Sequence, residues 1–233
     1  MALTIKKVGV IGSGQMGNGI AHVAALGGFA VVLNDISADR LKSAMATING
    51  NLTRQIARKL ITEEQRKQAL ANITANDRLD GLADCDLVIE TAVEKEEVKR
   101  KIFHDLCTTL KPEAIIASNT SSISITRLAA STDRPERFIG IHFMNPVPVM
   151  ELVELIRGIA TDDATFETAK AFVAKLGKQI AVSEDFPAFI VNRILLPMIN
   201  EACFALHEGV GDVASIDAGM KLGCNQPMGP LEL

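Results

Sequence analysis

Three glycines near the amino terminus constrain the fold of this chain more than any other feature. They lie in the segment Gly12-Ser-Gly14-Gln-Met-Gly17, between an apolar run over 7–11 and apolar positions at helical spacing over 17–27. A second β-rich run, 29–33, ends next to Asp35, which stands 18 residues after the last of the three glycines. A strand, a glycine turn, a helix and a second strand predict a βαβ unit, and therefore an α/β domain built on parallel strands.

The chemistry of this unit indicates a dinucleotide site. Gly12 permits a tight turn, Gly14 lets backbone amides approach a pyrophosphate, and Gly17 lets the helix pack closely on the strand. Gln15 and Met16, within the same turn, are expected to contribute to it. Asp35 can accept hydrogen bonds from both hydroxyls of an adenosine ribose but would repel a 2′-phosphate, and no Arg follows it until Arg40. The expected cofactor is NAD rather than NADP.

The remainder of the chain predicts a larger α/β domain followed by a helical one. Further strand patterns lie at 73–74, 87–90, 114–117, 138–143, 152–156 and 179–182. Helical patterns lie at 38–73 in two segments, 95–110, 164–176, 188–208 and 213–222. We predict a Rossmann-type NAD-binding domain over 1–184 and a helical C-terminal domain, apparently incomplete, over 185–233. The second is too short to bury a core of its own, so it should pack on the first domain or on another subunit.

Composition excludes several classes of function. A net charge of -4 argues against nucleic-acid binding. The longest apolar stretch, 186–206, carries Asn192, Arg193, Asn200 and Glu201, which is too polar for a membrane span. The four cysteines are scattered, so neither a metal site nor a disulfide framework is expected. The sequence enters a strand pattern at once, without room for a signal peptide, so we expect a cytoplasmic protein.

Two residues on neighbouring strands are candidates for proton transfer. His142 and Glu154 are equidistant from Pro148, so a hairpin centred there would make them cross-strand partners. Imidazole has a pKa near the working pH and can take the proton of an alcohol while hydride leaves, and a carboxylate can orient it. Acyl transfer is less favoured, because that chemistry also needs a nucleophile in a motif such as G-x-S-x-G, which the sequence lacks.

Polar segments at predicted strand ends are candidates for the nicotinamide half of the cofactor. They are Ala92-Val-Glu94 and Ser118-Asn119-Thr-Ser121, which should lie at the carboxyl edge of the sheet, although turn chemistry also explains the second. Asn192, within an otherwise apolar helix, is either a packing tie or a substrate ligand.

These residues resemble the 3-hydroxyacyl-CoA dehydrogenase family, and especially its short bacterial members that act on 3-hydroxybutyryl-CoA. The resemblance extends over essentially the whole chain and depends on five segments: Val10–Gly17, Ala117–Ser122, Gly140–Pro148, Phe189–Arg193 and Pro227–Glu232. It implies an NAD-dependent oxidoreductase of fatty acid metabolism, including β-oxidation, and a homodimer assembled through the C-terminal helical domain.

The resemblance also implies roles for individual residues. His142 would be the general base oriented by Glu154, and Ser121 and Asn192 would bind the reacting oxygens of an acyl-CoA substrate. Glu94, Lys99 and Asn145 would help to hold nicotinamide and ribose. The helical insertion after the second strand would contact coenzyme A, and its basic residues are Arg54, Arg58 and Lys59, for which a solvated helix face is the alternative.

The sequence departs from the family pattern in three places. Ala188 stands where the family usually has glycine, Asn51 stands where some members have a serine that contacts the coenzyme, and the sequence ends at Leu233, before the end of the family's helical domain. Three alternatives therefore stay open. They are a β-hydroxyacid dehydrogenase acting on a free acid, a non-catalytic NAD-binding structural protein, and an inactive fragment.

Overall fold

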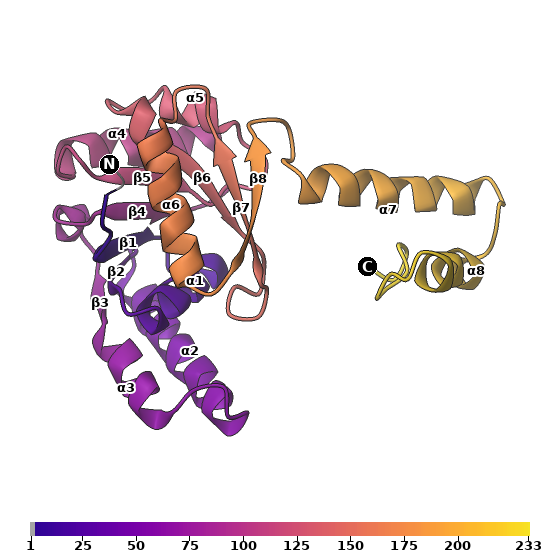
Figure 1. Ribbon diagram of the computed structural model, residues 1–233, viewed down its shortest axis with the longest axis horizontal. Coiled ribbons are helices and arrows are strands. Elements are labelled where there is room, and N and C mark those ends of the chain that lie inside the picture. Colours follow the sequence, from indigo (N-terminus) through magenta and orange to yellow (C-terminus); the bar gives the residue numbers. More distant parts are fainter. Residues whose placement is uncertain (1–2) are drawn as a thin grey trace. The chain divides into compact units, whose positions relative to one another are not determined.

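The computed structural model describes residues 3–233, which form two compact units. The first ends at Phe186 and the second comprises Pro187–Leu233. Figure 1 shows a sheet with helices on both faces in the first unit and helices alone in the second. Each unit is described by itself below.

The first unit is built on one sheet, and the residues at the ends of its strands owe their positions to it. Within residues 3–233 it has eight strands in the order β3-β2-β1-β4-β5-β6-β7-β8. Their bounds are β1 Lys7–Ile11, β2 Ala30–Asn34, β3 Ile73–Asn76, β4 Leu87–Glu90, β5 Ile115–Ser118, β6 Phe138–Phe143, β7 Leu152–Arg157 and β8 Gln179–Glu184. Strands β1 to β6 pair in parallel, β7 runs antiparallel to β6, and β8 is parallel to β7. The carboxyl ends of β1, β2, β4, β5 and β6 therefore share one edge.

Helices cover both faces of this sheet (Figure 1). Their bounds are α1 Gln15–Leu26, α2 Ala38–Ala57, α3 Glu63–Ala71, α4 Glu96–Thr109, α5 Ile125–Ala129 and α6 Asp163–Lys175. Short 3-10 turns, η1 and η2, lie at Leu79–Leu82 and Pro135–Arg137. The rings of Phe29 and Phe172 of α6 are in tilted contact on one face, and Phe103 of α4 packs edge-on against Phe138 on the other. Buried aliphatic side chains of the strands fill both layers, as expected for a parallel sheet covered on both sides.

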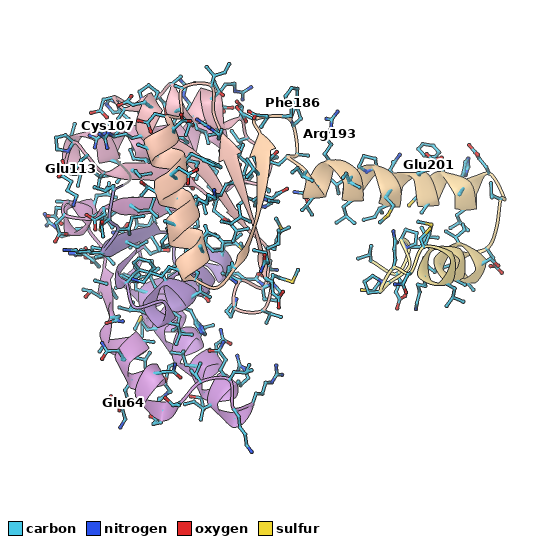
Figure 2. All side chains as sticks on the ribbon, viewed as in Figure 1. Glu64, Cys107, Glu113, Phe186, Arg193 and Glu201 are labelled. Carbon is cyan, nitrogen blue, oxygen red and sulfur yellow. The ribbon has the colours of Figure 1, made fainter. Side chains whose placement is uncertain are left out.

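Helices α2 and α3 form an arm that extends from the sheet (Figure 1), and Glu64 lies on α3 in this arm (Figure 2). The capping box at Thr62 and Gln65 is present and begins α3, and Arg66 of α3 donates to Asn49 of α2. Such an arm is additional to the βαβ repeat and presents one long helical face to solvent.

The second unit contains α7 Val191–His207, α8 Val213–Ala218 and a π-helical turn, η3 Gly219–Gly223. Figure 2 marks Arg193 and Glu201 on α7 and Phe186 at the end of the first unit. The sequence predicts a helix from 188, but α7 begins at Val191. Ala188 and Phe189 have φ of 67° and 53°, in the left-handed region, which a right-handed helix cannot include. The predicted fold class, a Rossmann-type sheet with a helical C-terminal segment, is confirmed.

Candidate active site

The glycine turn between β1 and α1 is held rigidly at the carboxyl edge of the sheet. Gly12 has φ of 91°, and a Cβ at Gly17 would lie 1.7 Å from the Gly12 carbonyl oxygen, so neither position accepts a side chain without a backbone shift. The Thr91 hydroxyl, at the end of β4, donates to the carbonyls of Ile11 and Gly12 at 2.8 and 3.0 Å. Thr91 is a supporting residue that sequence reasoning missed.

The same turn fits the pyrophosphate of a dinucleotide. Gly14 is the N-cap of α1, and within residues 3–233 no side chain caps that helix end, so first-turn amides point outward without intrahelical acceptors. A Cβ at Gly14 would meet no atom of the described chain within 4 Å, which leaves the approach open. Asp35 lies beside the turn, where its Oδ2 accepts from the amide and hydroxyl of Ser13, both at 2.9 Å.

His142 and Glu154 form a buried pair at this edge. They are directly opposite each other on β6 and β7, as the hairpin predicts. His142 Nδ1 lies 2.7 Å from Glu154 Oε2, and the two residues are 7% and 0% exposed. A carboxylate so placed fixes the imidazole orientation through Nδ1, so Nε2 is the ring nitrogen suited to exchange a proton with a bound group.

Glu94 accepts several hydrogen bonds from the polar segment that follows β5. Its Oε1 accepts from the hydroxyl of Thr120, from the Ser121 amide at 3.0 Å and from the Ser122 hydroxyl at 3.2 Å. Burial opposes the ionised form, but the hydrogen bond from Thr120 and the charge of Lys99 lower the pKa of the Glu94 carboxyl. Ser121 thus lies at the carboxyl edge with its backbone fixed by a carboxylate.

Asn119 ties this segment to the strand that carries His142. Its Oδ1 accepts from the Phe143 amide at 2.8 Å. The sequence predicts Asn119 as a cofactor ligand, and in the structure its carbonyl oxygen holds two strand ends together.

A second acid, Glu90, lies entirely inside the protein at the end of β4. It pairs with Lys99 and accepts from the Ser118 hydroxyl at 2.7 Å. Burial raises the pKa of the Glu90 carboxyl, against the influence of Lys99. Sequence reasoning placed Ser118 only within a candidate cofactor segment and missed Glu90, although an acid ending the apolar run Leu87-Val-Ile-Glu90 was a signal for a buried partner.

A cavity of about 690 Å³ opens beside the glycine turn. Its wall is formed by the turn, by α1, by the segment Asn145–Pro148 and by residues of α2. Gln15 donates to Asn145 Oδ1 at 2.9 Å across one end of this cavity. Met16 is half-buried and packs against the core.

The α2 side of this cavity leads to the predicted basic residues. Thr47 and Asn51 line the cavity, and Arg54 and Arg58 follow at helical spacing on the same face of the arm. Arg54 donates to Asn51 Oδ1. Lys59 follows in the left-handed conformation, with φ of 59°, and all three basic residues are exposed.

The structure brings together the predicted residues of the first unit at one sheet edge and along α2. Asn192 belongs to α7 in the second unit, where it is half-buried. Among residues 3–233, no cluster of three or more His, Cys, Asp or Glu side chains is arranged to hold a metal ion. No helix of that part of the chain is both long and apolar enough to cross a membrane.

Comparison with known families gives matches over both units. Residues 7–186 match the model of the 3-hydroxyacyl-CoA dehydrogenase NAD binding domain, and residues 189–233 match that of the 3-hydroxyacyl-CoA dehydrogenase C-terminal domain. Together they span almost the whole chain.

Individual relatives are similar over the same length. A 3-hydroxybutyryl-CoA dehydrogenase of Bradyrhizobium diazoefficiens is 80% identical over 233 residues, which are 100% of this chain and 80% of that protein. A probable 3-hydroxybutyryl-CoA dehydrogenase of Deinococcus radiodurans is 48% identical over 97% of this chain and 81% of its own. The crystal structure of (S)-3-hydroxybutyryl-CoA dehydrogenase from Ralstonia eutropha has a TM-score of 0.96 and 49% identity, covering 98% of this chain and 81% of that one.

Proposed function

Because this chain belongs to the 3-hydroxyacyl-CoA dehydrogenase family, an NAD-dependent oxidoreductase family, we propose that it interconverts (S)-3-hydroxybutyryl-CoA and acetoacetyl-CoA. The observation that carries this proposal is the buried His142–Glu154 pair at the sheet edge that also holds the glycine turn. Relatives with 80% and 48% identity carry the same substrate in their names.

His142 is the proposed general base. When bound, NAD supplies the acceptor for the hydride that leaves C3 of the substrate. His142 Nε2 takes the proton of the C3 hydroxyl, and Glu154 stabilises the resulting imidazolium through Nδ1. Ser121 donates to the reacting oxygen from the carboxyl edge, and Asn192 of the second unit is proposed as the other substrate ligand. In the reverse direction His142 returns the proton.

The cofactor residues have separate tasks. Gly12, Gly14 and Gly17, with the backbone of Gln15 and Met16, receive the pyrophosphate. Asp35 exchanges its bond to the Ser13 hydroxyl for the ribose hydroxyls. Glu94, Lys99 and Asn145 hold the nicotinamide and its ribose, and Asn119 binds the cofactor beside the strand end that it fixes.

The coenzyme A part of the substrate is proposed to follow the exposed face of α2. The cavity beside the glycine turn has a wall of α2 residues, and Arg54 and Arg58 continue that face outward with positive charge suited to phosphates, next to Lys59.

We propose three further properties at the level of the cell. The protein forms a homodimer through its C-terminal helical unit, acts in the cytoplasm, and serves fatty acid metabolism, including β-oxidation. Exposed apolar side chains on α7, among them Ile194, Leu196 and Phe204, support the first of these.

The catalytic proposal predicts that His142→Ala lowers kcat for NADH-dependent reduction of acetoacetyl-CoA by at least about 100-fold, because the proton donor is removed. The measurement is loss of NADH absorbance with purified protein. Replacing NADH by NADPH should weaken the reaction through Asp35.

The exposed His104 of α4 provides a matched control, and His104→Ala should retain the wild-type rate. A His142→Ala rate within threefold of wild type would exclude the proposed base. Turnover of free acetoacetate instead of the thioester would establish a free-acid dehydrogenase, and bound NADH without turnover would establish a non-catalytic protein.

A further inference from the structure

A buried histidine lies between α1 and α2, close to the cavity beside the glycine turn. His22 of α1 is 0% exposed, and its Nε2 lies 3.0 Å from Gln55 Oε1 of α2, an oxygen to which it donates. Its other ring nitrogen, Nδ1, has no hydrogen-bond partner within residues 3–233. An apolar side chain would avoid the cost of burying that nitrogen, which one neutral hydrogen bond offsets only in part. The pair therefore calls for an explanation beyond stability.

The pair continues the two helical faces that line the cavity. Asn18 and Gly19 of α1 line it, and His22 follows them at helical spacing. Asn51 lines it from α2, and Gln55 follows four residues later. The hydrogen bond therefore joins the two helices one turn beyond the cavity, at a place where neither of its side chains belongs to the cavity wall.

Gln55 lies in the outer part of α2, beyond the last buried side chain of that helix, which is Leu52. Within residues 3–233, its bond to His22 is the one side-chain hydrogen bond between α1 and α2. Gln55 directly follows Arg54 and precedes Arg58 by three residues. A bond at this point therefore determines where the basic part of α2 lies relative to the cavity.

The segment Asn145–Pro148, which forms another part of the cavity wall, is also held against α1. Gly19 lies so near Val147 that a Cβ on the glycine would be 2.9 Å from the Val147 Cβ. Lys178 donates to the Val147 carbonyl at 2.8 Å and so fixes the segment independently. Helix α1 is thus the common support of both walls, through Gly19 for this segment and through His22 for α2.

We propose that His22 and Gln55 are positioning residues that hold the outer part of α2 at a fixed distance from α1, and that they thereby determine the affinity for the nucleotide part of coenzyme A. This inference rests on the proposed function, since it assigns a support to the surface proposed for that coenzyme. Neither residue lines the cavity, so the pair acts through the basic residues Arg54 and Arg58.

The experiment separates the hydrogen bond from the side chains that form it. His22→Leu and Gln55→Leu each remove the bond with little change in volume, and the double variant puts an apolar contact in its place. His22→Gln retains a donor that can reach the Gln55 amide oxygen. Asn72→Leu is the matched control, because the Asn72 side chain donates to the Ala25 carbonyl at the other end of α1, away from the cavity.

Binding and turnover are measured separately for each variant. Calorimetry gives the Kd for coenzyme A, and nicotinamide fluorescence gives the Kd for NADH, read against a low protein background because the chain has no Trp or Tyr. Steady-state kinetics gives kcat and KM for acetoacetyl-CoA and for the same acyl group on N-acetylcysteamine, a thiol without the nucleotide.

We expect His22→Leu and Gln55→Leu to raise the Kd for coenzyme A and the KM for acetoacetyl-CoA by about fivefold, because the basic part of α2 is no longer preorganised. The kcat, the NADH Kd and the KM for the smaller thioester should change by less than about twofold, because only binding of the nucleotide part is weakened. The double variant should lose no more than either single variant, because both replacements remove the same bond. His22→Gln and Asn72→Leu should keep wild-type values.

Three results would overturn the inference. Wild-type affinity for coenzyme A in both leucine variants would show that the pair does not position α2. A loss in His22→Gln equal to that in His22→Leu would show that the hydrogen bond is not the cause. An equal loss in Asn72→Leu would show a general loosening of the fold.

Failure of the proposed function is a distinct result. It would appear as a wild-type protein that binds coenzyme A but does not reduce acetoacetyl-CoA. The Kd values for coenzyme A do not depend on turnover, so they would then still decide the role of His22 and Gln55.

Discussion

Ala188 shows how one residue can hold backbone strain at the junction before α7. Its φ of 67° lies in the left-handed region, where an L side chain costs about 1–2 kcal/mol. We predict that Ala188→Gly raises the free energy of unfolding by about 1 kcal/mol, after the greater chain entropy of glycine is counted. Urea denaturation measures this. Gly177→Ala, at φ of 73°, is the reverse replacement and should lower the free energy of unfolding. An Ala188→Gly variant less stable than wild type would contradict the claim that Ala188 is strained.

His22 predicts a pH dependence of stability. Burial lowers its pKa from 6.5, and although the hydrogen bond to Gln55 raises it, the charge of Lys178 lowers it further. The unfolded chain therefore binds the proton first as pH falls below about 6.5, and the folded protein loses stability there. We expect His22→Gln, which cannot be protonated, to lose less stability between about pH 7 and pH 5.

Unfolding in urea across that pH range measures the effect. His104→Gln, at an exposed position of α4, should follow the wild-type curve. Equal acid sensitivity of the His22→Gln variant and the wild type would show that other groups govern the loss.

At the residue scale, the sequence predicted residues that belong to a motif but did not predict which of them meet across the fold. The glycines and Asp35 could be found because their roles depend on positions close along the chain. Glu90, Lys99 and Ser118 meet across a strand, a helix and a second strand, and no spacing in the sequence encodes that meeting. The cofactor role of Lys99 stays a prediction, and its side chain is buried in the structure.

At the element scale, α2 carries a prediction about substrate recognition. We expect Arg54→Ala with Arg58→Ala to raise KM for acetoacetyl-CoA by about 10-fold, as two exposed phosphate contacts would. KM for the acetoacetyl thioester of N-acetylcysteamine, which lacks the nucleotide, should not change.

Steady-state kinetics on both thioesters provides the test. Lys67→Ala, an exposed lysine of the neighbouring helix α3, is the control for general loss of positive charge on the arm. An equal rise in KM for both substrates would show that coenzyme A does not bind along this face of α2.

The elements themselves were predictable to different degrees. The β6–β7 hairpin was predicted because Pro148 interrupts two apolar runs symmetrically, and the register found pairs His142 with Glu154. Helix α5 was not predicted, because it has five residues and begins with help from Asp185, which accepts from the amides of Ile125 and Thr126 some 60 residues away in sequence. A helix that short depends on its cap more than on its own propensity.

At the scale of the whole molecule, the proposed dimer gives a further prediction. Ile194 and Phe204 of α7 are 67% and 51% exposed, which is unfavourable for large apolar side chains in water. We expect Ile194→Glu with Phe204→Glu to convert a dimer into a monomer, because charge at an apolar interface would have to be desolvated.

Light scattering after gel filtration measures the mass. Glu201→Gln, at an exposed position of the same helix, is the control. An unchanged dimer mass in the double variant would exclude this face of α7 as the dimer interface. A wild-type protein that is itself a monomer would show that α7 does not bring two copies together.

The sequence predicted where the strands lie and that the first two are parallel, but not their order in the sheet, although right-handed crossovers between parallel strands allow few orders. The reversal at β7 followed from the hairpin. The strand pairing beyond it, in which β8 runs parallel to β7, depends on the return of α6 over the sheet and was not specified by any local pattern.

The antiparallel pairing of β6 and β7 also bears on how such a site can change over evolutionary time. The geometry of the proton-transferring pair is set by the β6–β7 register, in which the two residues lie opposite each other, and not by the segment that joins the strands. Insertions or deletions between Pro148 and Leu152 would therefore leave the paired side chains and Asn145 in place while changing the end of the cavity wall formed by Asn145–Pro148. New substrate preferences could arise there by changes in loop length alone, without any replacement of a reacting side chain.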